Sequence, residues 1–216
     1  MLSHNKNDGM ALMNAMQHAR ISAKRWGGEL EDYYEIHAFI DSTKSLCSDA
    51  RHRILHTLWG VNAAVIPVFG HSLQNSAGKS VDVKDLCERD HLLVDYQQRF
   101  IPTLNDFVSA IDARQLPPDF ERHVEQLHQH YSQDPAISQL LLSPLALTGK
   151  LHSLLLTHNS WFIGDILPRL GHPLRLQNVA CSPADFFNAM RFELWMDNGM
   201  AIPASAQALH QRRQTA

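Results

Sequence analysis

The stretch EDYYEIHAFIDSTKSLCSDARHRILH (residues 31–56), together with the later run KDLCERDHLLVD (residues 84–95), decides what kind of protein this chain can form. In both runs, apolar residues recur every three or four positions, which is the spacing of an amphipathic α-helix. Polar residues pair at the same spacing: His37 with Asp41, His52 with His56, and Glu88 with His91. Residues three or four apart share one helix face, so each pair can point at a common spot.

Extending the same pattern along the chain predicts a mainly α, multi-helix bundle. Helices are expected over residues 8–26, with Asp8 as cap, and over residues 31–46, 48–69 and 83–98. Residues 71–83 should form a small β-hairpin or extended loop, because short alternating flanks surround Asn75-Ser76-Ala77-Gly78. Later helices are expected after residue 118, over residues 144–170, and from Ser182-Pro183.

The segment Gln115-Leu116-Pro117-Pro118 is the best candidate for a domain boundary. It separates a His-rich helical domain over residues 1–114 from a helical C-terminal extension over residues 115–216 that packs on it. The apolar helices after Pro144 suit either packing on the first part or a homodimer interface, and the pattern leaves both open.

Composition narrows the classes of protein. A chain of 216 residues with 44% hydrophobic residues and a net charge of −3 suits a soluble globular fold and gives no reason to expect nucleic acid as a partner. The three cysteines form no CxxC motif, which fits a reducing compartment. With no secretory leader and no apolar run long enough to span a bilayer, we expect a cytoplasmic protein without a membrane partner.

Two segments about a hundred residues apart resemble one another. The first contains His56-x-x-Trp59 and Pro67-x-x-Gly70-His71, and the second contains His158-x-x-Trp161 and Pro168-x-x-Gly171-His172. Ile101-Pro102 is likewise echoed by Ile202-Pro203. Such an echo is compatible with a degenerate internal duplication as well as with chance. In a duplication, the second copy lacks counterparts of His52 and His91 and would serve as a scaffold.

The polar pairs favour a site for a divalent metal, with zinc first and iron or manganese as alternatives, because these ions take imidazole and carboxylate ligands. The expected ligands are His37, His52, His56, His91 and Glu88, with Asp95 one turn beyond His91. For a metal-dependent hydrolase acting on a phosphoester, Asp41 or Glu88 would take a proton from water, and Lys44 and Arg53 would offset negative charge. The partner would then be a small-molecule or phosphorylated substrate.

Three alternatives stay open. The first is a metal-stabilised binding module without enzymatic activity. The second is a ferritin-like di-iron protein, suggested by the second ExxH at Glu125–His128 and opposed by the prolines at 102, 117 and 118. The third is a metal-free helical interaction protein. The chain has no HExxH motif and no His-Asp dipeptide, so zincin-type proteases and HD-type phosphohydrolases are not supported.

Residues 26–111 resemble DUF6915, a family of bacterial and phage domains of unknown function. The matching residues are Trp26-Gly27-Gly28, Glu31-Asp32-Tyr33, Ile36-His37, Asp41-x-x-Lys44, Arg51-His52-Arg53-x-Leu55-His56, Phe69-Gly70, Asn75-x-x-Gly78, Glu88-x-x-His91, Asp95 and Ile101-Pro102. The resemblance implies a shared polar site at His37, Asp41, Lys44, His52, His56, Glu88 and His91, and no particular reaction. The chain departs from the family at Asp95-Tyr96-Gln97, where an Asp-x-Gly turn is expected, and after Pro117.

Overall fold

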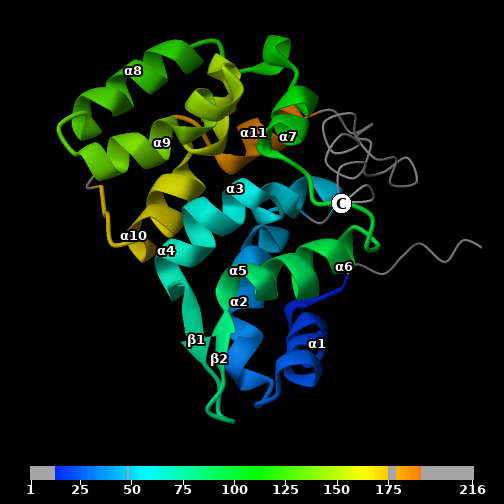
Figure 1. The fold of residues 1–216 in the computed structure, drawn as a ribbon. Helices are drawn as coiled ribbons and strands as arrows, with labels where there is room; N and C mark the ends of the chain where they lie inside the picture. The colour runs from blue at the N-terminus through cyan, green and yellow to red at the C-terminus, as the bar shows by residue number, and fades with distance from the viewer. Residues whose placement is uncertain (1–12, 48, 175–178, 191–216) are drawn as a thin grey trace, which may run out of the picture.

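The computed structural model describes residues 13–47, 49–174 and 179–190. Over these residues the fold is mainly helical, with one two-stranded antiparallel hairpin (Figure 1). The predicted fold class is confirmed. Among the described residues, no helix combines the length and the apolar character that crossing a bilayer requires.

The first two helices pack against each other. Helix α1 (Ala15–Trp26) begins with a capping box between Asn14 and Gln17, and it ends at Gly27. Helix α2 (Glu31–Ile40) follows at once and buries Tyr33, Ile36 and Phe39. The predicted cap Asp8 lies outside the described residues.

The predicted helix over residues 48–69 is broken, which corrects the sequence prediction. A 3₁₀ helix, Ser42–Ser45, follows α2, and a second 3₁₀ helix spans Ala50–Leu55. The chain then becomes extended at Thr57, whose side chain accepts a hydrogen bond from the amide of Gly60 and caps the next helix. That helix runs without a gap through α3 (Leu58–Gly60), a π-helical turn (Val61–Val65) and α4 (Ile66–Phe69). His52 and His56 therefore do not share one α-helical face.

The hairpin lies where the sequence predicts it. Strands β1 (Ser72–Gln74) and β2 (Ser80–Asp82) pair antiparallel around Asn75. A continuous helix follows, made of α5 (Val83–Leu86), a π-helical turn (Cys87–Leu92) and α6 (Leu93–Asp95). It ends before residue 98 because Gln97 and Gln98 have φ angles of 56° and 60°, which a right-handed helix cannot contain.

The rest of the described chain is helical too. It contains α7 (Leu104–Ala110), a 3₁₀ helix (Ala113–Gln115), α8 (Phe120–Tyr131), α9 (Pro135–Thr148), a 3₁₀ helix (Leu151–Leu156), a π-helical turn (Phe162–Ile166), α10 (Leu167–Arg169) and α11 (Pro183–Ala189). The single helix expected over residues 144–170 is wrong. Pro144 lies inside α9, and Gly149, which is left-handed at φ 66°, ends that helix.

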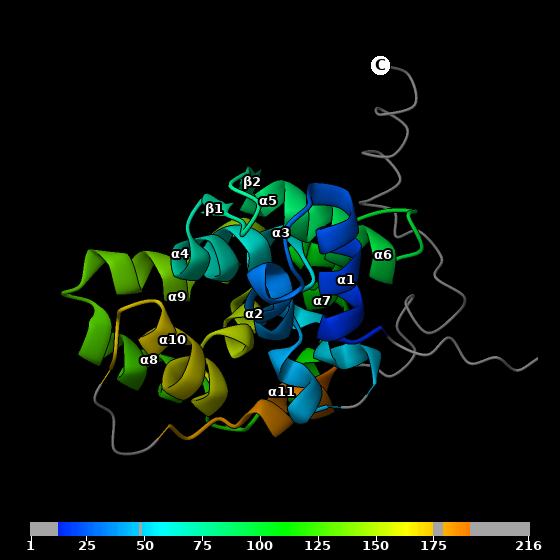
Figure 2. The same cartoon turned by 90° about the horizontal axis from the view of Figure 1, so that it is seen from below.

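The helices form two groups that meet at α3. In Figure 1 the hairpin and α1 lie at the bottom, whereas α8 and α9 lie at the top. Seen from below, α8 and α10 lie on one side of α2, and α1 and α6 on the other (Figure 2). Trp59 joins the groups, because its ring stacks on Phe162 and its indole donates to Ser143.

The two echoing segments have the same local structure. In each, a 3₁₀ helix leads into a helix with a π-helical turn and then a proline, at Pro67 and Pro168. Each ends at a glycine with φ 82°, Gly70 and Gly171. Common ancestry of the two segments and chance both stay open.

Candidate metal centre

Four acidic and imidazole side chains converge where α2 meets the helix over residues 83–95. They are Asp41 at the C-terminal end of α2, His56 just after a 3₁₀ helix, His91 in a π-helical turn, and Asp95 at the end of α6. All four are buried, and one ligand atom of each lies within 4.8 Å of the others. We call these four residues the His/Asp group. π-Helical turns occur often at functional sites.

The spacing of the ligand atoms suits one ion. His56 Nε2 lies 3.0 Å from His91 Nε2, 3.2 Å from Asp41 Oδ1 and 3.2 Å from Asp95 Oδ2. His91 Nε2 lies 3.4 Å from Asp41 Oδ1 and 3.9 Å from Asp95 Oδ2. Bonds of about 2.1 Å place ligand atoms about 3.4 Å apart in a tetrahedron and about 3.0 Å apart at adjacent octahedral corners. The His/Asp group could therefore hold a metal ion without rearrangement.

The polar atoms of this site are incompletely satisfied by hydrogen bonds. Asp41 Oδ2 and His56 Nδ1 are buried and make none. Buried carboxylates without partners are unfavourable unless a cation balances them. Lys44 pairs with Asp41, with its Nζ 2.8 Å from Asp41 Oδ1. Among the described residues, no lysine or arginine pairs with Asp95. A divalent ion would supply the missing positive charge.

The protonation states also suit metal binding. Burial, reinforced by the nearby His18, lowers the pKa of His91 to about 3, so this imidazole is neutral at neutral pH. Burial by itself would raise the pKa of the Asp41 carboxyl, but the close imidazole of His56 holds that pKa well below its ordinary value. Burial acts on Asp95 in the same way and is outweighed by His18 and His56, so its pKa is lowered too.

His18 is a residue of this site that the sequence prediction missed. It comes from α1, it is fully buried, and its Nε2 lies 3.1 Å from Asp95 Oδ1. Its ring stacks on that of His91, with centroids 3.9 Å apart. Its signal in the sequence is slight, since it only lies one turn after Ala15 in a predicted helix, whereas the structure shows that it shares a buried face with Ala19 and Ser22.

The other two predicted histidine ligands lie beside the His/Asp group. His37 lies behind His91, with their Nδ1 atoms 3.0 Å apart, and its Nε2 contacts Ser22. The ring of His52 is edge-on to that of His56, with centroids 5.3 Å apart, and His52 Nδ1 donates to the backbone oxygen of Asp49. Burial, reinforced by His56, lowers the pKa of His52 to about 3.

The predicted catalytic residues are placed differently from one another. Lys44 is at the site through its ion pair with Asp41. Arg53 is buried, its guanidinium lies 5.1 Å from the centre of the Tyr96 ring, and its Nε and Nη1 make no hydrogen bond. Glu88 is not brought into the His/Asp group, since its carboxylate pairs with Lys84 at 2.6 Å.

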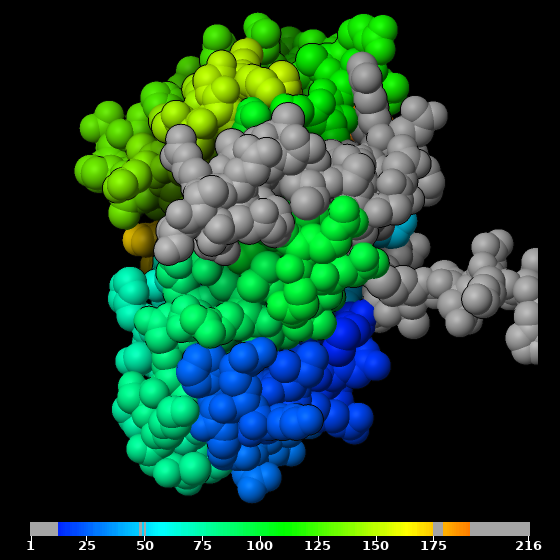
Figure 3. All heavy atoms as spheres, turned by 45° about the vertical axis from the view of Figure 1, so that its right-hand side comes forward, coloured from blue at the N-terminus to red at the C-terminus, as the bar shows by residue number. Residues whose placement is uncertain are grey.

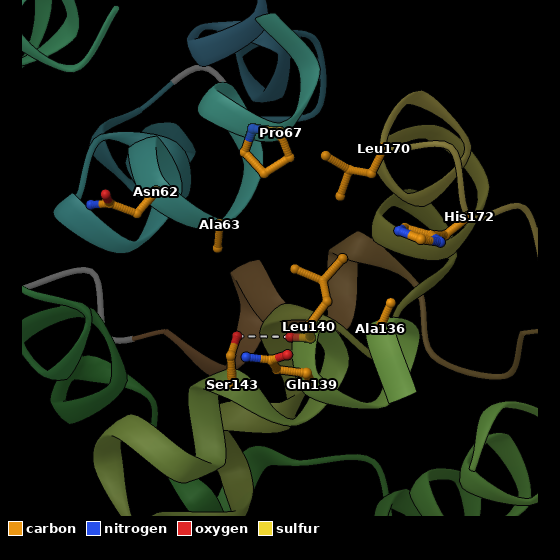
Figure 4. Close-up of a pocket in the computed structure, with 9 residues that line it drawn as sticks. All are labelled: Asn62, Ala63, Pro67, Ala136, Gln139, Leu140, Ser143, Leu170 and His172. Carbon is orange, nitrogen blue, oxygen red and sulfur yellow. Dashed lines mark hydrogen bonds between the residues drawn. The ribbon is translucent and has the colours of Figure 1, made fainter. Parts of the chain in front are cut away.

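A separate cavity of about 330 Å³ lies between the two groups of helices (Figure 4). Its lining comes from the helix over residues 58–69, from α9 and from the segment after α10: Asn62, Ala63, Pro67, Ala136, Gln139, Leu140, Ser143, Leu170 and His172. None of these residues belongs to the His/Asp group, so among the described residues the cavity and the His/Asp group are separate features.

The fold and the site thus define a mainly helical protein with a buried His/Asp group that could hold a metal ion. The family model of DUF6915, a domain of unknown function, matches residues 13–116, which confirms the resemblance expected from the sequence. Neither the curated proteins nor the solved structures contain a match to the chain. The division of the chain near residue 115 stays a prediction.

Proposed function

We propose that this chain is a metalloprotein in which Asp41, His56, His91 and Asp95 bind one divalent transition-metal ion. The observation that carries the proposal is the convergence of four buried ligand atoms, two of them carboxylate oxygens, at separations that one ion can bridge. Two imidazoles and two carboxylates suit zinc, iron and manganese. The free cysteines Cys47, Cys87 and Cys181 support a reducing compartment such as the cytoplasm.

The reaction that we propose is hydrolysis of a phosphoester or a related anionic substrate. A bound ion would supply Lewis acidity and lower the pKa of a water ligand from about 15.7 to about 7. In this reaction Asp41 Oδ2, which makes no hydrogen bond, would accept a proton from the attacking water, and Lys44 beside it would offset the negative charge of the substrate. Arg53 supports an anionic substrate, because a buried guanidinium with two unsatisfied nitrogens favours an oxyanion partner. Glu88, the other base expected from the sequence, pairs with Lys84 outside the His/Asp group and has no part in this proposal.

The competing proposal is a structural metal site in a binding module. It is favoured by the full burial of His56 and His91 and by the presence of four protein ligands, which can close a tetrahedral zinc site. The two uses differ in coordination number, since catalysis needs a position that the protein leaves open.

Elemental analysis of protein prepared without a polyhistidine tag tests the metal proposal. We expect about one zinc, iron or manganese per chain, lost in His56→Ala and in His91→Ala but kept in His128→Ala, which alters an exposed histidine of α8. Well under one metal per chain, with no uptake on reconstitution, would refute the proposal.

X-ray absorption spectroscopy of the loaded protein, combined with hydrolysis of p-nitrophenyl phosphate and bis(p-nitrophenyl) phosphate, separates the two uses. A water ligand together with hydrolysis that Arg53→Ala weakens supports the enzyme. Four protein ligands without a water, and no hydrolysis of either ester, support the structural site.

A further inference from the structure

Asp90, the residue before His91, is fully buried and is held by helix α1. Its carboxylate accepts hydrogen bonds from Arg25 Nε at 2.5 Å, from Trp26 Nε1 at 2.7 Å and from the Ser22 hydroxyl at 3.0 Å. Figure 3 shows α1, in blue, lying against the green residues of the neighbouring helices. These three hydrogen bonds tie helix α1 to the helix that carries His91.

The hydrogen bonds that start at Asp90 have a fixed direction. A carboxylate flanked by the donor-only groups of Arg25 and Trp26 acts as an acceptor, so Ser22 gives its single hydroxyl proton to Asp90. Ser22 Oγ must then accept the proton of His37 Nε2, which lies 2.9 Å away. His37 is fully buried, and its two ring nitrogens contact the Ser22 hydroxyl and the His91 ring rather than a carboxylate, so the neutral imidazole is favoured.

A neutral His37 that carries its proton on Nε2 has a bare Nδ1. That atom lies 3.0 Å from His91 Nδ1 and can only accept a hydrogen bond, so the proton of His91 is on Nδ1. The other nitrogen of His91, Nε2, is consequently bare, and it is the atom that faces His56 and Asp41.

We propose that Asp90 is a positioning residue that, through Ser22 and His37, fixes the tautomer of His91 and so presents the Nε2 lone pair to a metal ion. This inference rests on the proposed metal centre. In this arrangement His37 does not bind the ion but makes a hydrogen bond to His91, which does. Hydrogen-bonded partners of metal-binding histidines orient the ring and fix its tautomer in this way.

The backbone of Asp90 orients a second imidazole. Its carbonyl oxygen accepts a hydrogen bond from His18 Nδ1 at 2.7 Å, which turns His18 Nε2 toward Asp95 Oδ1. One residue thereby orients the rings on two sides of the His/Asp group. A substitution of the Asp90 side chain keeps the backbone contact with His18. The effect of the carboxylate on His37 can therefore be measured separately from the effect of the backbone carbonyl on His18.

Ser22→Ala is the sharpest test, because it removes the link while Asp90 keeps Arg25 and Trp26. Without an acceptor for its Nε2 proton, His37 should move that proton to Nδ1 and donate to His91, whose own proton then moves to Nε2. Two-bond ¹⁵N–¹H spectra of histidine-labelled, metal-free protein report the tautomer. Zinc affinity is measured by chelator competition, and we expect a loss of about 10- to 100-fold.

Asp90→Asn is the second variant, with the same expected change in tautomer and affinity. Ser45→Ala, at an exposed residue, and Asp85→Asn, at a half-buried residue that pairs with Arg89, are the matched controls and should leave both unchanged. The inference is overturned if wild-type His91 carries its proton on Nε2. It is also overturned if Ser22→Ala leaves the tautomer of His91 unchanged, whether or not the zinc affinity changes. If the wild-type protein binds no zinc, the metal centre fails, whereas the tautomer spectra still decide the role of Asp90.

Discussion

His56 Nε2 lies 3.0 Å from His91 Nε2, although 35 positions separate the two residues in the chain. Two ring nitrogens at this distance cannot both carry a proton, because two N–H donors would face each other. At least one of them is bare, and two carboxylate oxygens lie within 3.4 Å of the pair. An ion that replaces the remaining proton would be bound by all four side chains.

In a variant without His56, zinc should no longer raise the free energy of unfolding. In the wild-type protein, zinc at a hundred times its dissociation constant should raise the free energy of unfolding by about 2.7 kcal/mol, because it binds the folded state selectively. His56→Ala should show no such rise in thermal unfolding with and without zinc. His128→Ala, exposed on α8, should respond like the wild type. An equal rise in His56→Ala would place the metal elsewhere.

The stability of the metal-free protein should decrease as the pH is lowered below about 6.5. Burial lowers the pKa of His52 and of His91 to about 3 in the folded protein, whereas an unfolded histidine titrates near 6.5. Between these values the unfolded state binds more protons, so acid favours unfolding. We expect a loss of about 1 kcal/mol per histidine between about pH 6.5 and 5.5, measured by urea unfolding. His52→Gln should reduce the slope, and a flat profile would contradict the assignment of neutral, buried rings.

Gly60 should tolerate no side chain. A Cβ there would lie 2.2 Å from the backbone oxygen of Leu55, so the turn that carries His56 would have to shift. We expect Gly60→Ala to reduce the free energy of unfolding by about 1–3 kcal/mol or more, as overpacking does, and to weaken metal binding. The matched control is Gly164→Ala, since nothing lies within 4 Å of a Cβ at that helical position. Denaturant unfolding measures the free energy of unfolding of both variants. Equal values would contradict the close contact between Gly60 and the backbone of Leu55.

Gln97 should be a source of strain. It adopts φ 56° at the position where the family resemblance leads one to expect glycine, and left-handed backbone is unfavourable by about 1–2 kcal/mol for most residues. Gln97→Gly should therefore raise the midpoint of thermal unfolding. Glu125→Gly, in the exposed middle of α8, should lower it through the loss of about 1 kcal/mol. A fall in both variants would mean that the contacts of the Gln97 side chain outweigh its backbone strain.

The sequence by itself determined the helical class, the hairpin near Asn75 and the neighbourhood of the site. Residues three or four apart share one face of a helix. This spacing is enough to mark His56, His91, Asp41 and Asp95 as candidate site residues. The echo around Pro67 and Pro168 likewise carries local structure, because both copies form the same series of turns.

Only the tertiary structure decided which candidates meet. Spacing treats His52 and His56 alike, but the 3₁₀ helix kinks at Arg53 and ends at Leu55, and only His56 joins the His/Asp group. Spacing likewise favours Glu88, which the fold leaves with Lys84, and it gives no hint that α1 brings His18 and Ser22 to the helix of His91. Contacts between residues 15 to 72 positions apart depend on how helices pack, and packing is set by the whole core rather than by any local pattern.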